Sequence, residues 1–183
     1  MSLGPLASRS RGRDMHEIAF SFGGNVGDTA SILRNSMLQL VDQLPLTAPE
    51  SSSFYITVPW GVLDQRSFVN AVLIGKTARS PFDVLNFCLE VERCNGRHRE
   101  AKWGPRTLDI DIIYYGDLSV ETGALILPHP FALERSFVLV PLLELRPHAS
   151  LRGQSCKKSL EALAGVVGED PPVAALPPLQ FER

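Results

Sequence analysis

Four stretches of the chain have the hydrophobic pattern of β-strands. Residues 18–22, 51–58 and 68–74 carry apolar side chains at every second position, as a strand with one buried face does. Residues 107–115 are β-branched, aromatic or aliphatic except for two aspartates, and Gly-Pro and Gly-Asp dipeptides stand at its two ends. We therefore expect four strands, with a tight turn at Gly23-Gly24 after the first.

Apolar residues at helical spacing fill the gaps between these strands and follow the last one. The segments with this spacing are Ile32–Leu44, Leu85–Glu92, 138–145 and 159–167. Asp28 or Thr29 can cap the first helix, and Ser80-Pro81-Phe82-Asp83 is a typical start for the second. These segments predict four helices.

The order of elements through residue 115 is β-α-β-β-α-β. This is the split βαβ pattern of a ferredoxin-like fold, in which the first and third strands are central and the fourth lies at an edge beside the first. We predict an α+β protein with a ferredoxin-like βαββαβ sheet core and additional C-terminal helices. Residues 1–14 are expected to be a disordered extension or a cloning remnant, 15–169 a single domain, and 170–183 an irregular proline-rich tail.

Composition agrees with a soluble globular protein of one domain. The 183 residues are 44% hydrophobic and 21% charged, and no apolar run is long enough to span a membrane. The N-terminal residues lack the apolar segment of a secretory signal. Three cysteines without zinc-type spacing indicate a reducing compartment, so we expect a cytoplasmic protein.

The fourth strand carries the first sign of chemistry. Because strand side chains alternate, Asp109 and Asp111 share a face with Ile113 and Tyr115, and the two carboxylates lie roughly 7 Å apart along the strand. Two carboxylates on one face of an apolar strand normally either raise the pKa of one of them or recruit a cation, and Mg²⁺ takes one or two carboxylates together with substrate phosphates. The alternative is a sheet edge at which both aspartates face water.

A basic segment directly precedes this strand. Residues 93–106 contain five arginines and lysines against the single acid Glu100, whereas the whole chain has a net charge of −2. Arginines next to a carboxylate pair suit a metal–polyphosphate complex, because they can clamp phosphate oxygens bidentately. A solvated run of charge would explain the arginines but not Trp103 and the rigid Gly104-Pro105 that follow them.

The ten residues from Lys102 to Asp111, KWGPRTLDID, closely resemble the signature of the hydroxymethyl-dihydropterin pyrophosphokinase family. The resemblance extends from about Ile18 to Leu163. It implies an α+β fold and transfer of the terminal diphosphate of ATP to a pterin alcohol, with two Mg²⁺ ions as cofactors. It also implies ATP and hydroxymethyl-dihydropterin as small-molecule partners; we expect a monomer without nucleic-acid or membrane partners.

The resemblance assigns expected roles to particular residues. Catalytic residues would be Arg97, Arg99, Arg106, Asp109 and Asp111, and the two aspartates would hold the metal. ATP would be bound by Leu85, Arg97, Arg99, Lys102, Trp103, Arg106, Ile112, His129 and Arg135. The pterin would be bound by Gly23, Thr57, Val58, Trp60, Phe68, Asn70, Asp109 and Phe137. Departures from the family pattern occur at Val58, Glu100, Ala124, Ile126 and Pro130.

Two of these assignments also have support from residue chemistry. Asn70 lies among apolar strand residues, and its paired donor and acceptor suit the amide-like edge of a pterin, although a hydrogen-bonded core asparagine is the simpler alternative. Phe68 offers a stacking surface beside it. His129 stands between two prolines and is expected to be rigidly held.

Two other functions remain as alternatives at this point. An RNA-binding module can combine this topology with exposed aromatics and a basic loop, although two aspartates would repel phosphates. A two-metal nucleotidyl cyclase or polymerase palm also places carboxylates on a ferredoxin-like sheet, and its product would be pyrophosphate rather than AMP. Asn70 and the two phenylalanines favour a flat heterocycle as ligand instead.

Overall fold

The computed structural model describes residues 14–57, 66–96, 106–164 and 172–181. Its elements in chain order are β1 (His16–Gly24), α1 (Thr29–Gln43), β2 (Thr47–Ser51), β3 (Phe54–Thr57), β4 (Phe68–Thr77), α2 (Pro81–Cys94), β5 (Asp109–Tyr115), β6 (Val120–Glu121), β7 (Ile126–Leu127), a 3₁₀ turn (Ala132–Glu134), α3 (Ser136–Leu145), β8 (Ser150–Leu151), β9 (Gln154–Ser155), α4 (Cys156–Leu163) and β10 (Val173–Leu176). The expected α+β class is confirmed.

The main sheet is antiparallel and has the order β10-β3-β4-β1-β5, with β2 also paired to β4. The first predicted strand, β1, and the third, β4, are therefore central, and β5 lies at an edge beside β1. Both expected caps of the first two helices are present: the side chain of Asp28 accepts from the backbone of Ser31, and Ser80 accepts from Asp83.

The second predicted strand, 51–58, is wrong as a single element. It consists of two strands, β2 and β3, that are separated at Ser52 and Ser53. The fully buried Ser52 turns its side chain back to the sheet, where its hydroxyl accepts from the amide of Val72. The hydroxyls of Ser51 and Ser52 also donate to the carbonyls of Ser52 and Ser53, so local side-chain bonds compete with the strand ladder where it is interrupted.

A β-bulge in β5 changes which residues share a face. Phe20 pairs with Ile112 and Ala19 with Tyr114, so Ile113 is an extra residue without a partner in β1. Before the bulge the alternation holds, and Asp109 and Asp111 point to the same side as predicted. After it the alternation is reversed, so the prediction that Tyr115 shares their face is wrong.

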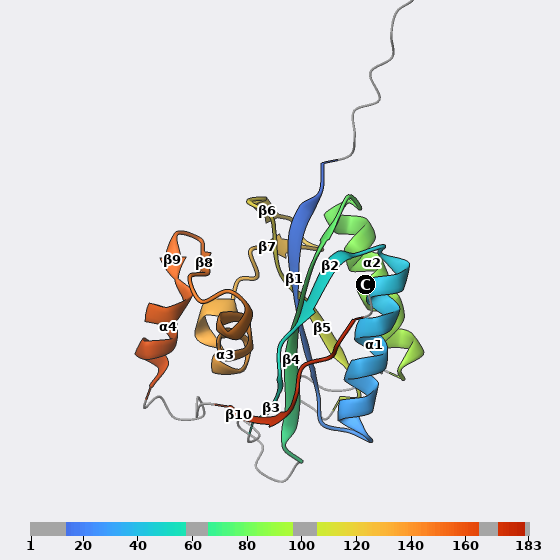
Figure 1. Cartoon of the computed structure of the whole chain (residues 1–183). Coiled ribbons are helices and arrows are strands. Elements are labelled where there is room, and N and C mark those ends of the chain that lie inside the picture. The colour runs from blue at the N-terminus through green and yellow to red at the C-terminus, as the bar shows by residue number, and fades with distance from the viewer. Residues whose placement is uncertain (1–13, 58–65, 97–105, 165–171, 182–183) are drawn as a thin grey trace, which may run out of the picture.

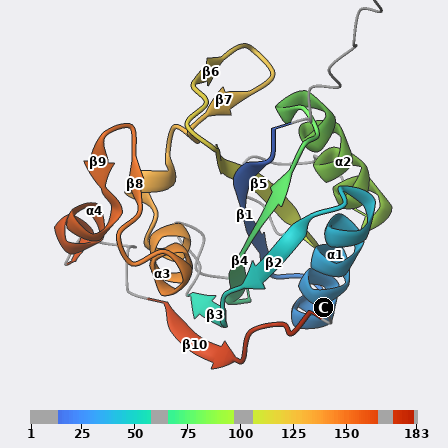
Figure 2. The same ribbon diagram turned by 45° about the horizontal axis from the view of Figure 1, so that its top comes forward.

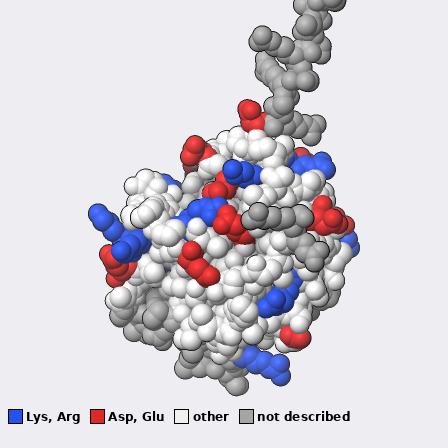
Figure 3. Space-filling view, in the orientation of Figure 1, with Lys and Arg blue, Asp and Glu red and all other residues white. Residues whose placement is uncertain are grey.

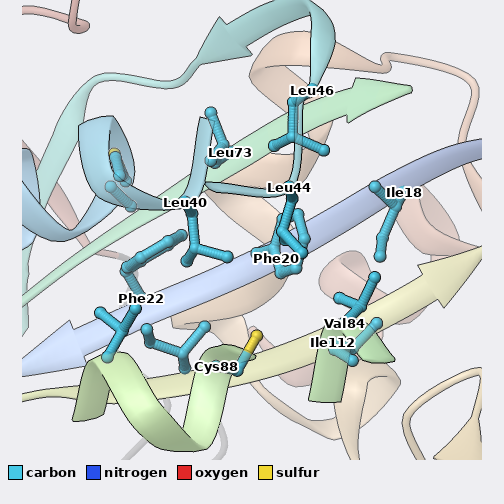
Figure 4. Close-up of a cluster of buried hydrophobic side chains, with 14 of the residues drawn as sticks. Ile18, Phe20, Phe22, Leu40, Leu44, Leu46, Leu73, Val84, Cys88 and Ile112 are labelled. Atoms are coloured by element: carbon cyan, nitrogen blue, oxygen red, sulfur yellow. The ribbon is translucent and has the colours of Figure 1, made fainter. Parts of the chain in front are cut away.

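Two hydrophobic layers enclose the sheet, with α1 and α2 on one side and α3 and α4 on the other (Figure 1). The layer between the sheet and α1/α2 is built around Phe20, Phe22, Leu40 and Cys88, and Figure 4 shows Ile112 of β5 among them. The layer under α3 is smaller and contains Ala19, Val72, Ile74, Ile113, Val138, Leu139 and Leu142.

Helix α3 covers only part of its side of the sheet. It is tied to β3 by Glu144, whose carboxylate accepts from the amide and hydroxyl of Ser53 and from the hydroxyl of Tyr55. At its C-terminal end Arg146 pairs with Glu17 and Glu50. These contacts fix the helix over the sheet and leave its N-terminal end, at Ser136, directed toward the first half of β5.

The C-terminal part differs from expectation at two places. Helix α4 begins at Cys156 and ends at Leu163, earlier than the predicted 159–167. The tail is not wholly irregular, because β10 pairs with the edge strand β3 (Figure 2) and Phe181 packs against the α1/α2 layer. Within the described ranges, no helix is long and apolar enough to cross a membrane.

Candidate active site

Four of the residues predicted to bind substrate lie in one row across the sheet, on the side of α3. Asp109 of β5 is paired with Gly23 of β1, and Gly23 is paired with Asn70 of β4. Thr57 of β3 lies next to Asn70: the side-chain nitrogen Nδ2 of Asn70 donates to the hydroxyl of Thr57 at 3.0 Å. Residues from four strands thus meet although the sequence separates them by up to 86 positions.

The middle of this row is Gly23, which lies directly beside the side chain of Asn70. Asn70 is 4% exposed, and its Oδ1 lies 2.9 Å from the position where a Cβ on Gly23 would be. Only glycine leaves room for the carboxamide in this orientation. Between Asp109 and Asn70 the row therefore has no side chain from β1.

One end of the row is closed by a corner that joins β1 to the segment before β5. Asn25 is buried, its backbone amide donates to the carbonyl of Arg106, and its side-chain oxygen accepts from the amide of Arg106. A Cβ on Gly24 would lie 2.5 Å from the carbonyl oxygen of Thr107, so the two backbones are in close contact here. This corner sets the direction from which Arg106 approaches the aspartates.

Each aspartate is paired with an arginine. Asp109 contacts the guanidinium of Arg106, and Asp111 Oδ2 lies 3.4 Å from Nη1 of Arg135. The Asp111 side chain is 39% exposed and that of Asp109 is 21% exposed, so both are accessible to a ligand. The two cations reduce the repulsion that two carboxylates on one face would otherwise cause.

The His129 ring directs its Nε2 atom at the carboxylate of Asp111. Its Nδ1 accepts from the backbone amide of Phe131 at 3.2 Å, and its Nε2 lies 3.8 Å from Asp111 Oδ2. Burial lowers the pKa of His129, and this outweighs the attraction of Asp111 for the protonated ring. Because Nδ1 is the acceptor in the bond from Phe131, the neutral ring carries its proton on Nε2, which can donate a hydrogen bond toward the site.

Arg135 is held between two phenyl rings. Its guanidinium carbon lies 5.6 Å from the ring centroid of Phe131 and 5.7 Å from that of Phe137. These distances are within the range of cation–π contacts. The arginine is thus kept at the N-terminal end of α3 with its charge directed at Asp111.

Glu92 of α2 holds the backbone of β5 between the two aspartates. It is 3% exposed, on α2, and its Oε1 accepts from the backbone amide of Ile110 at 2.7 Å. This amide lies between the two aspartates in the chain, so the bond fixes the stretch of backbone that orients both carboxylates. The sequence pattern places Glu92 at the end of a helical segment and gives no sign of this contact.

The donors present fit a magnesium–nucleotide site rather than a site built from protein ligands alone. No group of three or more His, Cys, Asp or Glu residues suited to a metal occurs in the described part of the chain. Two aspartates on one strand face do occur, and Mg²⁺ in nucleotide sites typically binds one or two carboxylates and completes its shell with water and phosphate oxygens. Asp109 and Asp111 could supply these carboxylates.

Not every predicted residue joins this row. The side chain of Ile112 lies in the opposite layer with α2, and Leu85 packs against the same layer, so only the backbone of Ile112 could reach a ligand on the aspartate side. Phe68 is on the aspartate side by alternation with Asn70. The predicted residues that lie outside the described ranges are Arg97, Arg99, Lys102, Trp103, Val58 and Trp60.

Comparison with known proteins identifies the family of the chain. The chain matches the model of the 7,8-dihydro-6-hydroxymethylpterin-pyrophosphokinase (HPPK) family over residues 19–147. It is 39% identical over 141 residues to the 2-amino-4-hydroxy-6-hydroxymethyldihydropteridine pyrophosphokinase of Methylorubrum extorquens, covering 77% of this chain and 89% of the relative. The protein of the same name from Bacillus subtilis is 37% identical over 150 residues, covering 81% and 90%.

A solved structure shows the same fold. The HPPK-DHPS protein of Plasmodium falciparum in its crystal structure with pteroate matches with a TM-score of 0.65 and 13% identity, over 81% of this chain and 42% of that one. The chain thus spans less than half of that longer protein. With the family model matched over residues 19–147 and relatives of similar length at 37–39% identity, this chain belongs to the 7,8-dihydro-6-hydroxymethylpterin-pyrophosphokinase family.

Proposed function

We propose that this protein transfers the β,γ-diphosphate of ATP to the hydroxymethyl group of 6-hydroxymethyl-7,8-dihydropterin, a step of folate biosynthesis, and releases AMP. The family match and the names of the relatives support the pyrophosphokinase reaction. One structural observation carries the assignment of the site. The carboxylates of Asp109 and Asp111 point to the side of the sheet on which Asn70 lies, and Gly23 is paired between Asp109 and Asn70.

The pterin fits the end of the row at Asn70. A pterin has an amide-like edge that needs both a donor and an acceptor, and the carboxamide of Asn70 has both. Its Oδ1 is next to Gly23, and its side-chain nitrogen donates to the hydroxyl of Thr57. Phe68 and Phe137 are the aromatic residues proposed to stack on the two faces of the ring.

The nucleotide fits the end at the aspartates. Arg106 and Arg135 can bind phosphate oxygens when they leave their carboxylate partners, and Nε2 of His129 can donate a hydrogen bond there. Asp109 and Asp111 would hold two Mg²⁺ ions, which would neutralise charge on the transferred group when bound. Arg97, Arg99 and Lys102 are further candidates for phosphate binding, and Leu85, Trp103 and Ile112 for contacts with the nucleoside.

Catalysis in this arrangement depends on positioning and charge rather than on a side-chain base. In-line attack by the pterin hydroxyl on the β-phosphorus of ATP requires the two substrates to meet between Asn70 and Asp111. The arginines stabilise charge on the diphosphate as the bond to AMP breaks. We find no strong general base among the described residues of the row.

Product analysis tests this function directly. The protein is incubated with ATP, Mg²⁺ and hydroxymethyl-dihydropterin, and each component is omitted in turn. We expect AMP only when all three are present. Release of pyrophosphate would instead support a palm-type nucleotidyl transferase, and ADP or AMP without the pterin would contradict the proposed transfer. Asp109→Asn and Asp111→Asn should each abolish most Mg²⁺-dependent turnover while the protein stays folded.

The sheet topology and the surface charge bear on the choice between this enzyme and an RNA-binding module. The strand order supports a ferredoxin-like sheet in which β2 and β3 together form the second strand. On the face shown in Figure 3, acidic and basic side chains of the described residues are mixed rather than gathered into one basic surface, which gives no support to RNA binding. We propose a cytoplasmic monomer that acts on two small molecules.

A further inference from the structure

Arg152 occupies a backbone conformation that is unfavourable for its residue type. It stands at the turn between β8 and β9 with φ of 52°, followed by Gly153 with φ of 74°. Two successive residues with positive φ are typical of the tightest hairpin turns, where Asn, Asp or Gly is the usual first residue. An arginine has no local hydrogen bond that favours this region, so its side chain should account for its presence.

The side chain of Arg152 is bonded to the segment that carries His129. Its Nε and Nη2 donate to the carbonyl oxygen of Pro128 at 3.3 and 2.8 Å. The neighbouring amide of His129 donates to the carbonyl of Ile113 at 2.8 Å. The peptide group between Pro128 and His129 is therefore held at its oxygen by Arg152 and at its nitrogen by β5.

This double attachment decides where the His129 ring points. The ring is fixed further by the amide of Phe131, which donates to Nδ1, and Nε2 is thereby directed at Asp111. Without Arg152, the peptide before His129 would be held only through its nitrogen and could rotate about that bond. Arg152 and Pro128 line the same open groove, and the two bonds from the guanidinium are the side-chain bonds to the Pro128 carbonyl that the described residues show.

We propose that Arg152 is a positioning residue for ATP binding, because it holds the Pro128 peptide and thereby aims the Nε2 donor of His129 at the phosphate site. This inference rests on the proposed function, in which His129 binds ATP. Arg152 lies 23 residues after His129 in the chain and outside residues 19–147, the part matched by the family model. It does not touch the reacting atoms and acts only through the histidine segment.

Arg152→Asn is the discriminating variant. Asparagine tolerates positive φ, so the turn is kept, but its side chain is too short to reach Pro128. We expect an unchanged or slightly raised Tm, a KM for ATP raised by about three- to tenfold, and kcat and the KM for the pterin changed by less than about twofold. Arg152→Lys, which can donate one bond to the same carbonyl, should recover part of the ATP affinity.

A matched control removes a different arginine from a backbone carbonyl. Arg34 on α1 donates to the carbonyl of Pro177 at 3.5 Å, on the side of the sheet opposite the aspartates. Arg34→Gln should leave the KM for ATP unchanged, which excludes a general effect of lost surface charge. A lower Tm of Arg152→Asn with an unchanged KM for ATP would show that Arg152 only stabilises the hairpin, and the inference would be wrong.

A double-mutant cycle tests whether Arg152 acts through His129. In a His129→Ala background, Arg152→Asn should not raise the KM for ATP further. The same increase in both backgrounds would mean that Arg152 acts independently of His129, against the proposal. Wild type and His129→Ala alone report on the underlying function. No pterin-dependent AMP from wild type would refute the reaction, and a normal KM for ATP in His129→Ala would refute the role of the histidine and this inference with it.

Discussion

Two adjacent glycines at the end of β1 should respond very differently to alanine. In Gly23→Ala the new Cβ would lie 2.9 Å from Oδ1 of Asn70, the end of a side chain that can turn away. In Gly24→Ala it would lie 2.5 Å from the carbonyl oxygen of Thr107, which is backbone and is fixed by the corner between β1 and β5. The first substitution should therefore alter the site, and the second should alter the fold.

The size of the first effect follows from the contacts of Asn70. Turning its carboxamide away breaks the 3.0 Å bond to Thr57 and removes the oriented edge that we assign to the pterin. One or two neutral hydrogen bonds contribute about 0.5–1.5 kcal/mol each, so the KM for the pterin should rise about tenfold. The KM for ATP should change little, because Asn70 lies at the other end of the row from Asp111.

Steady-state kinetics and thermal unfolding of three variants check this reasoning. Gly24→Ala should lower the free energy of unfolding by about 2–4 kcal/mol. Gly23→Ala should lower it by less. Gly75→Ala on β4, where the Cβ would lie 3.2 Å from Cβ of Leu46, is the matched control for a glycine change in the sheet and should leave the pterin KM unchanged. In an Asn70→Ala background, Gly23→Ala should have no further effect on the pterin KM. A normal pterin KM in Gly23→Ala would refute the account.

Three further predictions concern stability. Glu92→Ala leaves the buried amide of Ile110 without its acceptor and should lower the free energy of unfolding in urea by about 1–3 kcal/mol. Glu92→Gln keeps an acceptor and should retain most of this stability. Equal losses in the two variants would argue against the bond. Burial alone would raise the pKa of Glu17, but hydrogen bonds, foremost from Arg146, hold it below 4.5. The contribution of the Glu17 carboxylate to folding stability is therefore complete above pH 4.5 and is lost as the pH falls through its lower folded-state pKa. The Tm of the wild type should thus exceed that of Glu17→Gln by less as the pH is lowered. A Tm difference that stays constant with pH would contradict this. Deleting 173–183 uncovers the edge of β3 and should lower Tm and cause association visible in light scattering.

The sequence predicted local structure well where local chemistry decides it. Asp28 and Ser80 cap the two helices as expected, and the alternation in 18–22 and 68–74 corresponds to the two central strands. The pairing of Asp109 and Asp111 on one face was also predictable, because only the two-residue period of a strand is needed.

Features that depend on distant contacts were not predictable. The bulge at Ile113 arises because β5 must bury Tyr115 with the helices and Ile113 under α3, and no local pattern encodes that choice. Likewise, a glutamate at the end of an apolar stripe looks the same whether it is solvated or, as with Glu92, accepts from a strand 18 residues away. The pairing of Asn25 with Arg106 spans 81 residues and left no signal at either end.

The arginine partners of the two aspartates have a consequence for how the protein handles metal. Arg106 pairs with Asp109 and Arg135 pairs with Asp111, so each of the two carboxylates has a cationic partner from the protein itself. The fold should thus not depend on an ion, and a chelator should leave Tm unchanged. On the proposed function, metal and nucleotide must enter by an exchange of partners, in which the ions take the carboxylates and the phosphates take the arginines. Such an exchange replaces each ion pair by another, so we expect the metal to bind together with the nucleotide and not to the protein alone.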